Sequence, residues 1–246
     1  MKTEQQKLSV QRRDFAKDYQ YLRGYELMSA FLKDIMPGEL ALVSSFGAES
    51  AILLHMVSRI APDTPVIFLE TGKLFEQTLS YKEQLIKVFG LSNVQSAYPN
   101  GGRLGKHDPK GRLWQQDPDM CCHIRKTLPL QEALQPFSGW ITGRKHYQSK
   151  LRAMLPAIED DGDQIKLNPL IDYTPEDIRV YFEQHNLPKH PLFSKGYKSI
   201  GCEPCTAKSA DNGNVRSGRW QHAPNKTECG IHIEGGKVIR IREDNN

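Results

Sequence analysis

"LALVSSFGAES" (residues 40–50) joins a short apolar run to a polar turn that contains glycine. The run predicts a buried strand from Leu40 to Phe46, and apolar residues at helical spacing in "ESAILLHMVSRI" (49–60) predict a helix after the turn. Backbone N–H groups and the dipole at the start of such a helix favour an anion. A tight turn with a serine cap explains the same residues, so this stretch predicts the fold unit and leaves the anion site open.

The alternation of strand and helix recurs along the chain. Further strands are predicted at residues 65–72, 93–99 and 139–145, and helices at residues 14–36, 75–90, 122–134 and after an N-cap at Thr174. This order predicts an α/β, Rossmann-like fold with a mainly parallel sheet and helices on both faces. Ligands bind such sheets beyond the carboxyl ends of the strands, where "SSFGAES", "ETGK" and "TGRKHYQSK" form polar loops.

The composition is typical of a soluble globular protein. The 246 residues are 38% hydrophobic and 25% charged, and no apolar run reaches the roughly 18 residues that span a membrane. The polar start lacks the apolar stretch of a secretory signal, so we expect a cytoplasmic protein with no membrane partner. The well-mixed net charge of +4 does not indicate nucleic acid and suits a small anionic ligand.

Five cysteines carry the most specific signal. Cys202 and Cys205 form a C-x-x-C, Cys121 and Cys122 are adjacent, and Cys229 stands alone. In a chain without an export signal, such thiols indicate metal binding or redox activity rather than disulfides. The spacing of the two pairs leaves an iron–sulfur cluster, a zinc site or neither open. For Cys229, a polar tail with glycines favours a functional thiol over a small buried hydrophobe.

Several motifs resemble a known family. Residues 44–50 are similar to the nucleotide-binding loop of the PP-loop superfamily, usually written SGGxDS, with Phe46 and Glu49 as departures that point away from intact ATP. Four further motifs, in the same order along the chain, resemble those of the assimilatory adenylylsulfate (APS) reductases of the PAPS/APS reductase family. They are "CCHIRK" (121–126), "KGYKSIGCEPCT" (195–206), "RSGRW" (216–220) and "KTECGIH" (226–232). The resemblance runs from about Leu40 to His232. Reductases of the PAPS type generally lack both cysteine pairs, which favours APS as the substrate.

The resemblance implies a chemistry and its partners. The enzyme would reduce APS to sulfite and AMP with a thioredoxin or glutaredoxin-like reductant, in sulfate assimilation and cysteine biosynthesis. A [4Fe-4S] cluster would be held by Cys121, Cys122, Cys202 and Cys205. With these four thiols committed by the resemblance, Cys229 remains as the nucleophile that forms an S-sulfonate. A homo-oligomer is expected by analogy with the family.

The family's motifs also imply roles at matching positions. The implied catalytic residues are Cys229, His232, Lys126, Arg216 and Arg219. The implied substrate-binding residues are Ser44, Ser45, Phe46, Gly47, Ala48, Glu49, Ser50, Leu69, Glu70, Thr71, Gly72, Gly143, Arg144 and Lys145. Arginine's planar donor fork suits sulfate or phosphate oxygens. Lys126, about one helical turn after the adjacent cysteines, is expected to carry positive charge between cluster and substrate.

We expect one domain with three parts. Residues 1–36 form a helical segment, residues 37–212 a PP-loop nucleotide-binding domain with the iron–sulfur site, and residues 213–246 a C-terminal segment. Within the last, residues 213–232 are predicted to be a mobile lid that carries Cys229, and "IHIEGGKVIRI" a small hairpin that restrains it. "DPDMCC" lacks a histidine that many family members have. Three alternatives remain: a cluster-bearing PAPS reductase, a PP-loop enzyme that thiolates tRNA, and a non-catalytic zinc-binding interaction module.

Overall fold

Six strands form one sheet in the spatial order β3-β2-β1-β4-β6-β5. They are β1 (Leu40–Ser44), β2 (Val66–Leu69), β3 (Val94–Ala97), β4 (Gly139–Ile141), β5 (Ile158–Asp161) and β6 (Gln164–Leu167). β5 runs antiparallel to β6, and every other neighbouring pair is parallel. The predicted mainly parallel sheet is therefore confirmed, with β5 and β6 as strands that the sequence did not predict. This computed structural model describes residues 15–161, 164–210 and 214–230.

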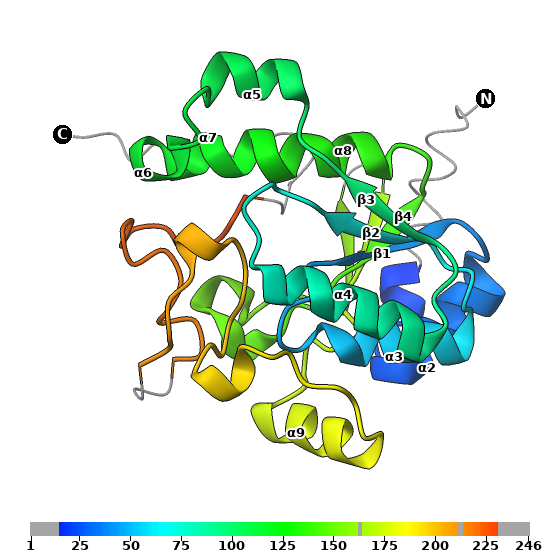
Figure 1. Cartoon of the computed structure of the whole chain (residues 1–246). Helices are drawn as coiled ribbons and strands as arrows, with labels where there is room; N and C mark the ends of the chain where they lie inside the picture. Colours follow the sequence, from blue (N-terminus) through cyan, green and yellow to red (C-terminus); the bar gives the residue numbers. More distant parts are fainter. Residues whose placement is uncertain (1–14, 162–163, 211–213, 231–246) are drawn as a thin grey trace, which may run out of the picture.

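Helices cover both faces of the sheet (Figure 1). On one face lie α2 (Gly24–Ser29), α3 (Ser50–Ile60) and α4 (Glu76–Phe89), and on the other α8 (Leu128–Leu134) packs against β2 and β3. The pleat of the strands explains this, because Leu42 and Phe68 belong to the core beneath α3 whereas Ala41 and Ile67 belong to the core with Leu130 of α8. The shorter helices are α5 (Gly101–His107), α6 (Leu113–Gln116), α7 (Pro118–Cys122) and α9 (Pro175–Gln184).

The predicted helical segment at residues 14–36 is interrupted. Its described part begins with a helical turn at residues 15–18, and α2 starts only at Gly24. Gly24 has a φ of +49°, and a side chain there would meet the hydroxyl of Tyr173, so only glycine fits the break. From Ala30 to Ile35 the helix continues as a π-helix.

The predicted helix at residues 122–134 is confirmed but is not a uniform α-helix. His123–Thr127 form a π-helical stretch between α7 and α8, in which Leu128 donates its N–H to the carbonyl of His123. Pro129 follows with no N–H to give, which favours the wider turn over a regular one. The irregular stretch therefore lies directly after the two adjacent cysteines.

The order of the strands determines where a ligand can bind. The chain makes β1, β2 and β3 on one side of the sheet and then places β4 on the other side of β1. Such a reversal leaves a crevice at the carboxyl ends of the central strands. Short 3-10 turns follow β4, at His146–Gln148 and Lys150–Arg152. Two others occur in the yellow to orange segment after α9 in Figure 1, at Phe193–Lys195 and Glu203–Cys205. Among the helices described, none combines the length and the apolar character needed to cross a membrane.

Candidate active site

A cavity of about 230 Å³ opens at the carboxyl ends of β1, β2 and β4. Its walls come from the loops after these strands, from the π-helical stretch His123–Thr127 and from the segment that follows α9. Most of the predicted site residues line it: Ser44, Ser45, Gly47, Ala48, Glu49, Ser50, Leu69, Thr71, Lys126, Gly143, Arg144, Lys145, Arg216, Arg219 and Cys229. Residues from separate motifs thus share one cavity.

Three of the predicted substrate-binding residues, Phe46, Glu70 and Gly72, do not line this cavity. His232 and the predicted hairpin lie outside the described residues. The ring of Phe46 is fully buried and packs edge-on against Phe68, with ring centres 5.4 Å apart. The ring of Phe46 therefore belongs to the core, and the predicted contact of this residue with a substrate stays a prediction. Glu70 accepts the N–H of Gly72 at 2.8 Å, so both residues shape the turn after β2.

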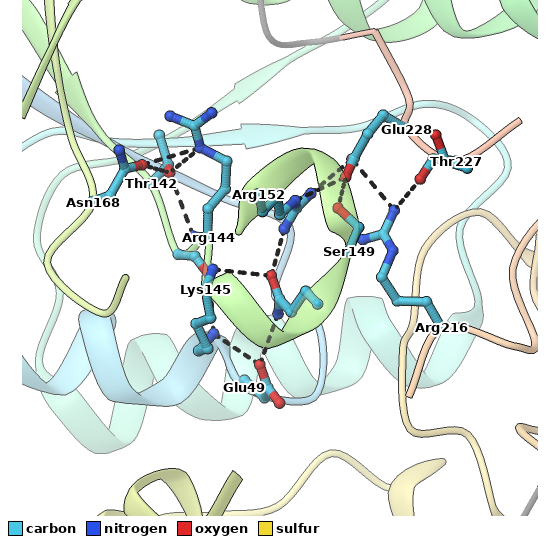
Figure 2. Close-up of polar contacts among 12 residues, drawn as sticks. Glu49, Thr142, Arg144, Lys145, Ser149, Arg152, Asn168, Arg216, Thr227 and Glu228 are labelled. Atoms are coloured by element: carbon cyan, nitrogen blue, oxygen red, sulfur yellow. Dashed lines mark hydrogen bonds and ion pairs between the residues drawn. The ribbon is translucent and has the colours of Figure 1, made fainter. Parts of the chain in front are cut away.

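Glu49 and Lys145 form an ion pair in the wall of the cavity (Figure 2). Lys145 Nζ lies 2.8 Å from Glu49 Oε2 and donates to the carbonyl of Gly143 at 2.9 Å. The Tyr147 hydroxyl and the Gln148 amide donate to the same carboxylate at 2.7 and 3.1 Å. Burial alone would raise the pKa of Glu49, but Lys145 and the two donors lower it overall. Because the Lys145 side chain is only 2% exposed, its charge depends on Glu49 for compensation.

Arg144 is directed to partners inside the protein. Its Nε donates to Asn168 Oδ1 at 3.0 Å and to Thr142 Oγ1 at 3.2 Å, and its guanidinium forms an ion pair with Glu159. The residue is 5% exposed. Its charge is therefore neutralised within the wall, and its predicted role with the substrate stays a prediction.

Glu228 connects the C-terminal tail to the wall of the cavity (Figure 2). Arg152 donates from Nε and Nη2 to the two carboxylate oxygens, at 2.8 and 2.7 Å. Arg216 Nη2 lies 3.3 Å from Oε2 and donates to the carbonyl of Thr227 at 2.7 Å, and Ser149 Oγ donates to Oε1 at 3.3 Å. Burial alone would raise the pKa of Glu228, but Arg152 and Arg216 lower it overall. Sequence reasoning missed Arg152, for which the available signal was a basic residue just beyond the third polar loop.

Trp220 orders the basic residues of the tail. It is 3% exposed, has a φ of +49° and donates its backbone N–H to the carbonyl of Cys205 at 3.1 Å. The guanidinium carbons of Arg219 and Arg216 lie 4.5 and 5.3 Å from the centre of its ring, and Lys226 Nζ lies 5.8 Å away. The indole therefore helps to position two predicted catalytic arginines.

Lys126 and Cys229 both line the cavity and interact electrostatically. Lys126 lines this cavity and also a second, smaller one. Burial alone would lower the pKa of Lys126, but negative charge at the thiols of Cys202 and Cys229 raises it overall. Cys229 is partly buried, and the hydroxyl of Thr127 donates to the carbonyl of Gly230 at 3.2 Å beside it. A cation next to an accessible thiol suits nucleophilic attack on an anionic substrate.

Residues 39–208 match the phosphoadenosine phosphosulfate reductase domain family. The chain belongs to this family. An adenosine 5'-phosphosulfate reductase from Mesorhizobium japonicum is 46% identical over 221 residues, which cover 89% of this chain and 86% of that protein. A phosphoadenosine 5'-phosphosulfate reductase from Gloeobacter violaceus is 39% identical, over 79% of this chain and 82% of that protein. Family membership confirms the predicted class of enzyme, a reductase that acts on a sulfur group.

The family's fold is also found among solved structures. Phosphoadenylyl-sulfate reductase from Candida auris, in a phosphate complex, aligns with a TM-score of 0.65 and 21% identity over 84% of this chain and 98% of that one. FMN adenylyltransferase from Candida glabrata aligns with a TM-score of 0.55 and 15% identity, over 82% and 75%. These likenesses confirm the predicted PP-loop, Rossmann-like fold.

The four paired cysteines of this reductase come together in the second cavity. Cys121, Cys122, Cys202 and Cys205 are all buried and line one space of about 10 Å³. Over the described residues, no three Cys, His, Asp or Glu side chains are arranged to hold a metal ion. The lining contains four thiols and no carboxylate, and four thiolates are a donor set that iron–sulfur clusters use. The residues present therefore fit the predicted cluster, which stays a prediction.

Burial governs the acidity of these thiols. Burial and the neighbouring Cys122 raise the pKa of Cys121 to about 12, and burial and Cys202 raise that of Cys205 to about 11. For Cys202, burial alone would raise the pKa, but Lys126 and a contact with the Thr71 hydroxyl lower it overall. The thiol nearest the lysine is thus the most easily ionised of these three.

Proposed function

We propose that this chain reduces adenosine 5'-phosphosulfate to sulfite and AMP through an S-sulfonate on Cys229. The observation that carries the proposal is that Cys229 lines the same cavity as the loop at residues 44–50 and Lys126. The 46% identity to an adenosine 5'-phosphosulfate reductase supports it. The substrate class follows from an anion-binding loop, cations and a thiol in one cavity.

In the proposed reaction, the Cys229 thiolate attacks the sulfur of the substrate. A sulfur–sulfur bond forms, the bond between sulfur and the bridging oxygen breaks, and AMP leaves with the electron pair. A thiolate of a thioredoxin-like or glutaredoxin-like dithiol then attacks Sγ of Cys229, and sulfite leaves with the electron pair. The partner's second thiol resolves the mixed disulfide, so the dithiol is oxidised and Cys229 returns as a thiol.

Residues of the cavity wall take the other roles. Lys126, Arg216 and Arg219 would neutralise the negative oxygens of the phosphosulfate. Backbone N–H groups of the loop before α3, which begins at Ser50, would hold an anion at the start of that helix. Leu69 and Thr71 would contact the nucleoside from the end of β2.

A cofactor and partners complete the proposal. The paired cysteines would hold a [4Fe-4S] cluster, which would tune the neighbouring site electrostatically, since the thiol steps already account for the two electrons. Lys126 lines both cavities, which supports a link between them. The thioredoxin-like reductant, the homo-oligomer, the three-part organisation and the mobile lid at residues 213–232 also belong to this proposal.

The test is to trap the intermediate. Anaerobically purified protein is incubated with adenosine 5'-phosphosulfate without reductant, and the added SO3 mass is located by peptide mapping. We expect it on the peptide that contains Cys229, and none on the Cys229→Ser variant. Modification of another residue would refute the mechanism.

A second candidate is a preference for the 3'-phosphorylated substrate. The observation that supports this candidate is the 39% identity to the relative from Gloeobacter violaceus, which is named for that substrate. Values of kcat/KM for the two nucleotides separate the candidates. We expect the larger value for adenosine 5'-phosphosulfate, and the reverse order would establish the second candidate.

A further inference from the structure

The carboxylate of Glu228 is one of the polar connections between the Cys229 segment and the body of the protein, beside the ion pair of Lys226 with Asp119 and the bond of Thr127 to the carbonyl of Gly230. Arg152 belongs to the 3-10 turn Lys150–Arg152 after β4, so its paired bonds to Glu228 cross from the sheet to the tail (Figure 2). The side chains of Arg152, Arg216 and Glu228 are 10%, 14% and 16% exposed. Partial burial and two-point geometry make such a contact stronger than a surface ion pair.

The same two arginines line the cavity in which the substrate would bind. Both donors on the forked face of Arg152 are used by Glu228, and its Nη1 is used by Gln148. Arg216 gives one Nη2 to Glu228 and to the Thr227 carbonyl. A carboxylate and a sulfate or phosphate group require the same face of a guanidinium, so the two cannot occupy it together.

The other carboxylate in the cavity wall differs from Glu228. Glu49 lies on the loop between β1 and α3, and its partner Lys145 also belongs to the body of the protein. Only the bonds of Glu228, among the ion pairs described in this wall, join residues of the tail to residues of the body. An anion that displaces this carboxylate would therefore loosen the tail at the cavity wall, while the contacts of Lys226 with Asp119 and of Thr127 with Gly230 remain.

We propose that Glu228 is a positioning residue that holds the Cys229 segment against the cavity and competes with anionic groups of the substrate for Arg152 and Arg216. The competition with substrate rests on the proposed function. Because coupling between two binding events is reciprocal, an anion on these arginines loosens the tail, and loss of the Glu228 charge strengthens binding of the anion.

The first test measures closure of the tail and needs no catalytic turnover. The full chain is treated with iodoacetamide, an uncharged reagent, and alkylation at Cys229 is followed by peptide mapping. Sodium sulfate is compared with sodium chloride at equal ionic strength. We expect sulfate to accelerate alkylation of the wild-type chain by about 10-fold, a typical size for coupling between sites. A rate that sulfate leaves unchanged would overturn the proposed competition.

Variants provide matched controls. Glu228→Gln is expected to be alkylated fast without sulfate and to lose its response to sulfate, whereas Glu228→Asp, which keeps the charge, should retain part of that response. Glu176→Gln removes a carboxylate from an exposed ion pair on α9 and should behave as the wild type. Equal responses to sulfate in Glu228→Gln and the wild type would contradict the assignment of Glu228.

The second test uses the proposed substrate. For Glu228→Gln we expect KM for adenosine 5'-phosphosulfate to fall, because two arginines are released, and kcat to change little, because bound substrate has already displaced Glu228 in the wild type. A rise in KM would refute the competition. If the trapping experiment fails while sulfate still accelerates alkylation, the proposed function fails and the positioning role of Glu228 stands.

Discussion

Replacing Glu49 by Gln tests whether the ion pair with Lys145 stabilises the loop between β1 and α3, where we propose that an anion binds. The substitution keeps the shape of the side chain but puts an NH2 group among donors. Lys145 Nζ and the Gln148 amide now lie 2.8 and 3.1 Å from carboxylate oxygens. After the change, the amide oxygen can still accept from both of these groups and the NH2 group faces the Tyr147 hydroxyl, but the 2% exposed Lys145 keeps its charge without a counter-ion.

The expected loss follows from burial. Removing one partner of a buried ion pair typically destabilises a protein by about 3–5 kcal/mol. The Glu49 side chain is 22% exposed, so the lower end applies and we expect about 3 kcal/mol. For a chain of this size, roughly 2–4 °C per kcal/mol converts this to a fall in Tm of about 6–12 °C.

The assay is urea-induced unfolding of the full chain followed by far-UV circular dichroism. The double variant Glu49→Gln/Lys145→Met removes the unpaired charge and should recover at least about 1 kcal/mol relative to Glu49→Gln, since apolar replacement of a buried pair is often tolerated. Glu176→Gln, from an exposed pair, should keep the wild-type midpoint. A loss below about 1 kcal/mol for Glu49→Gln, or a double variant less stable than the single one, would refute the reasoning.

Three further changes probe other parts of the molecule. Gly201→Ala would place a Cβ 2.6 Å from Cζ of Arg219 and should lower kcat/KM by about 10-fold or more. The control Gly105→Ala, where a Cβ meets nothing within 4 Å, should leave kcat/KM unchanged. Equal kcat/KM values for the two variants would show that the Arg219 guanidinium tolerates displacement. Burial lowers the pKa of His190 to about 4, so the unfolded chain takes up a proton below pH 6.5 that the folded chain refuses. Stability should therefore fall by about 2 kcal/mol between pH 7.5 and pH 5 relative to a His190→Asn variant, and parallel pH profiles in urea unfolding would contradict this. Cys122→Ser should lower the iron bound per chain and Cys229→Ser should not; unchanged iron in Cys122→Ser would exclude that thiol as a ligand.

Local patterns predicted much of the fold, and tertiary contacts account for what was missed. Three of the four predicted strands, β1, β2 and β4, contain short apolar runs that end in polar loops, which is a pattern that a sequence displays directly. β6 was missed because it contains Lys166, which is 2% exposed and lies with its Nζ 4.8 Å from the ring centre of Trp140. A charged residue that finds its aromatic partner in β4 interrupts the apolar pattern, and nothing nearby in the sequence reveals that partner.

The site shows the same division. The loop after β1 and the lone Cys229 were recognised from motifs, and both line the cavity. Arg152 was missed because its role depends on Glu228, a residue 76 positions away in the sequence. Phe46 was predicted to bind substrate because a motif gives the positions of residues but not the direction of each side chain. Its ring packs in the core against Phe68.

The fluorescence of Trp220 could report the position of the C-terminal tail. A bulky residue at positive φ is strained, and it keeps that conformation only while surrounding contacts hold it. Those contacts include the cations of Arg216, Arg219 and Lys226 around the indole. Trp220 belongs to the tail itself and donates its backbone N–H to Cys205 in the body, so opening of the tail would expose the 3% exposed indole to water and change its fluorescence. In a variant whose other two tryptophans, Trp114 and Trp140, are replaced by Phe, the rate of that change would time the opening of the tail without any label.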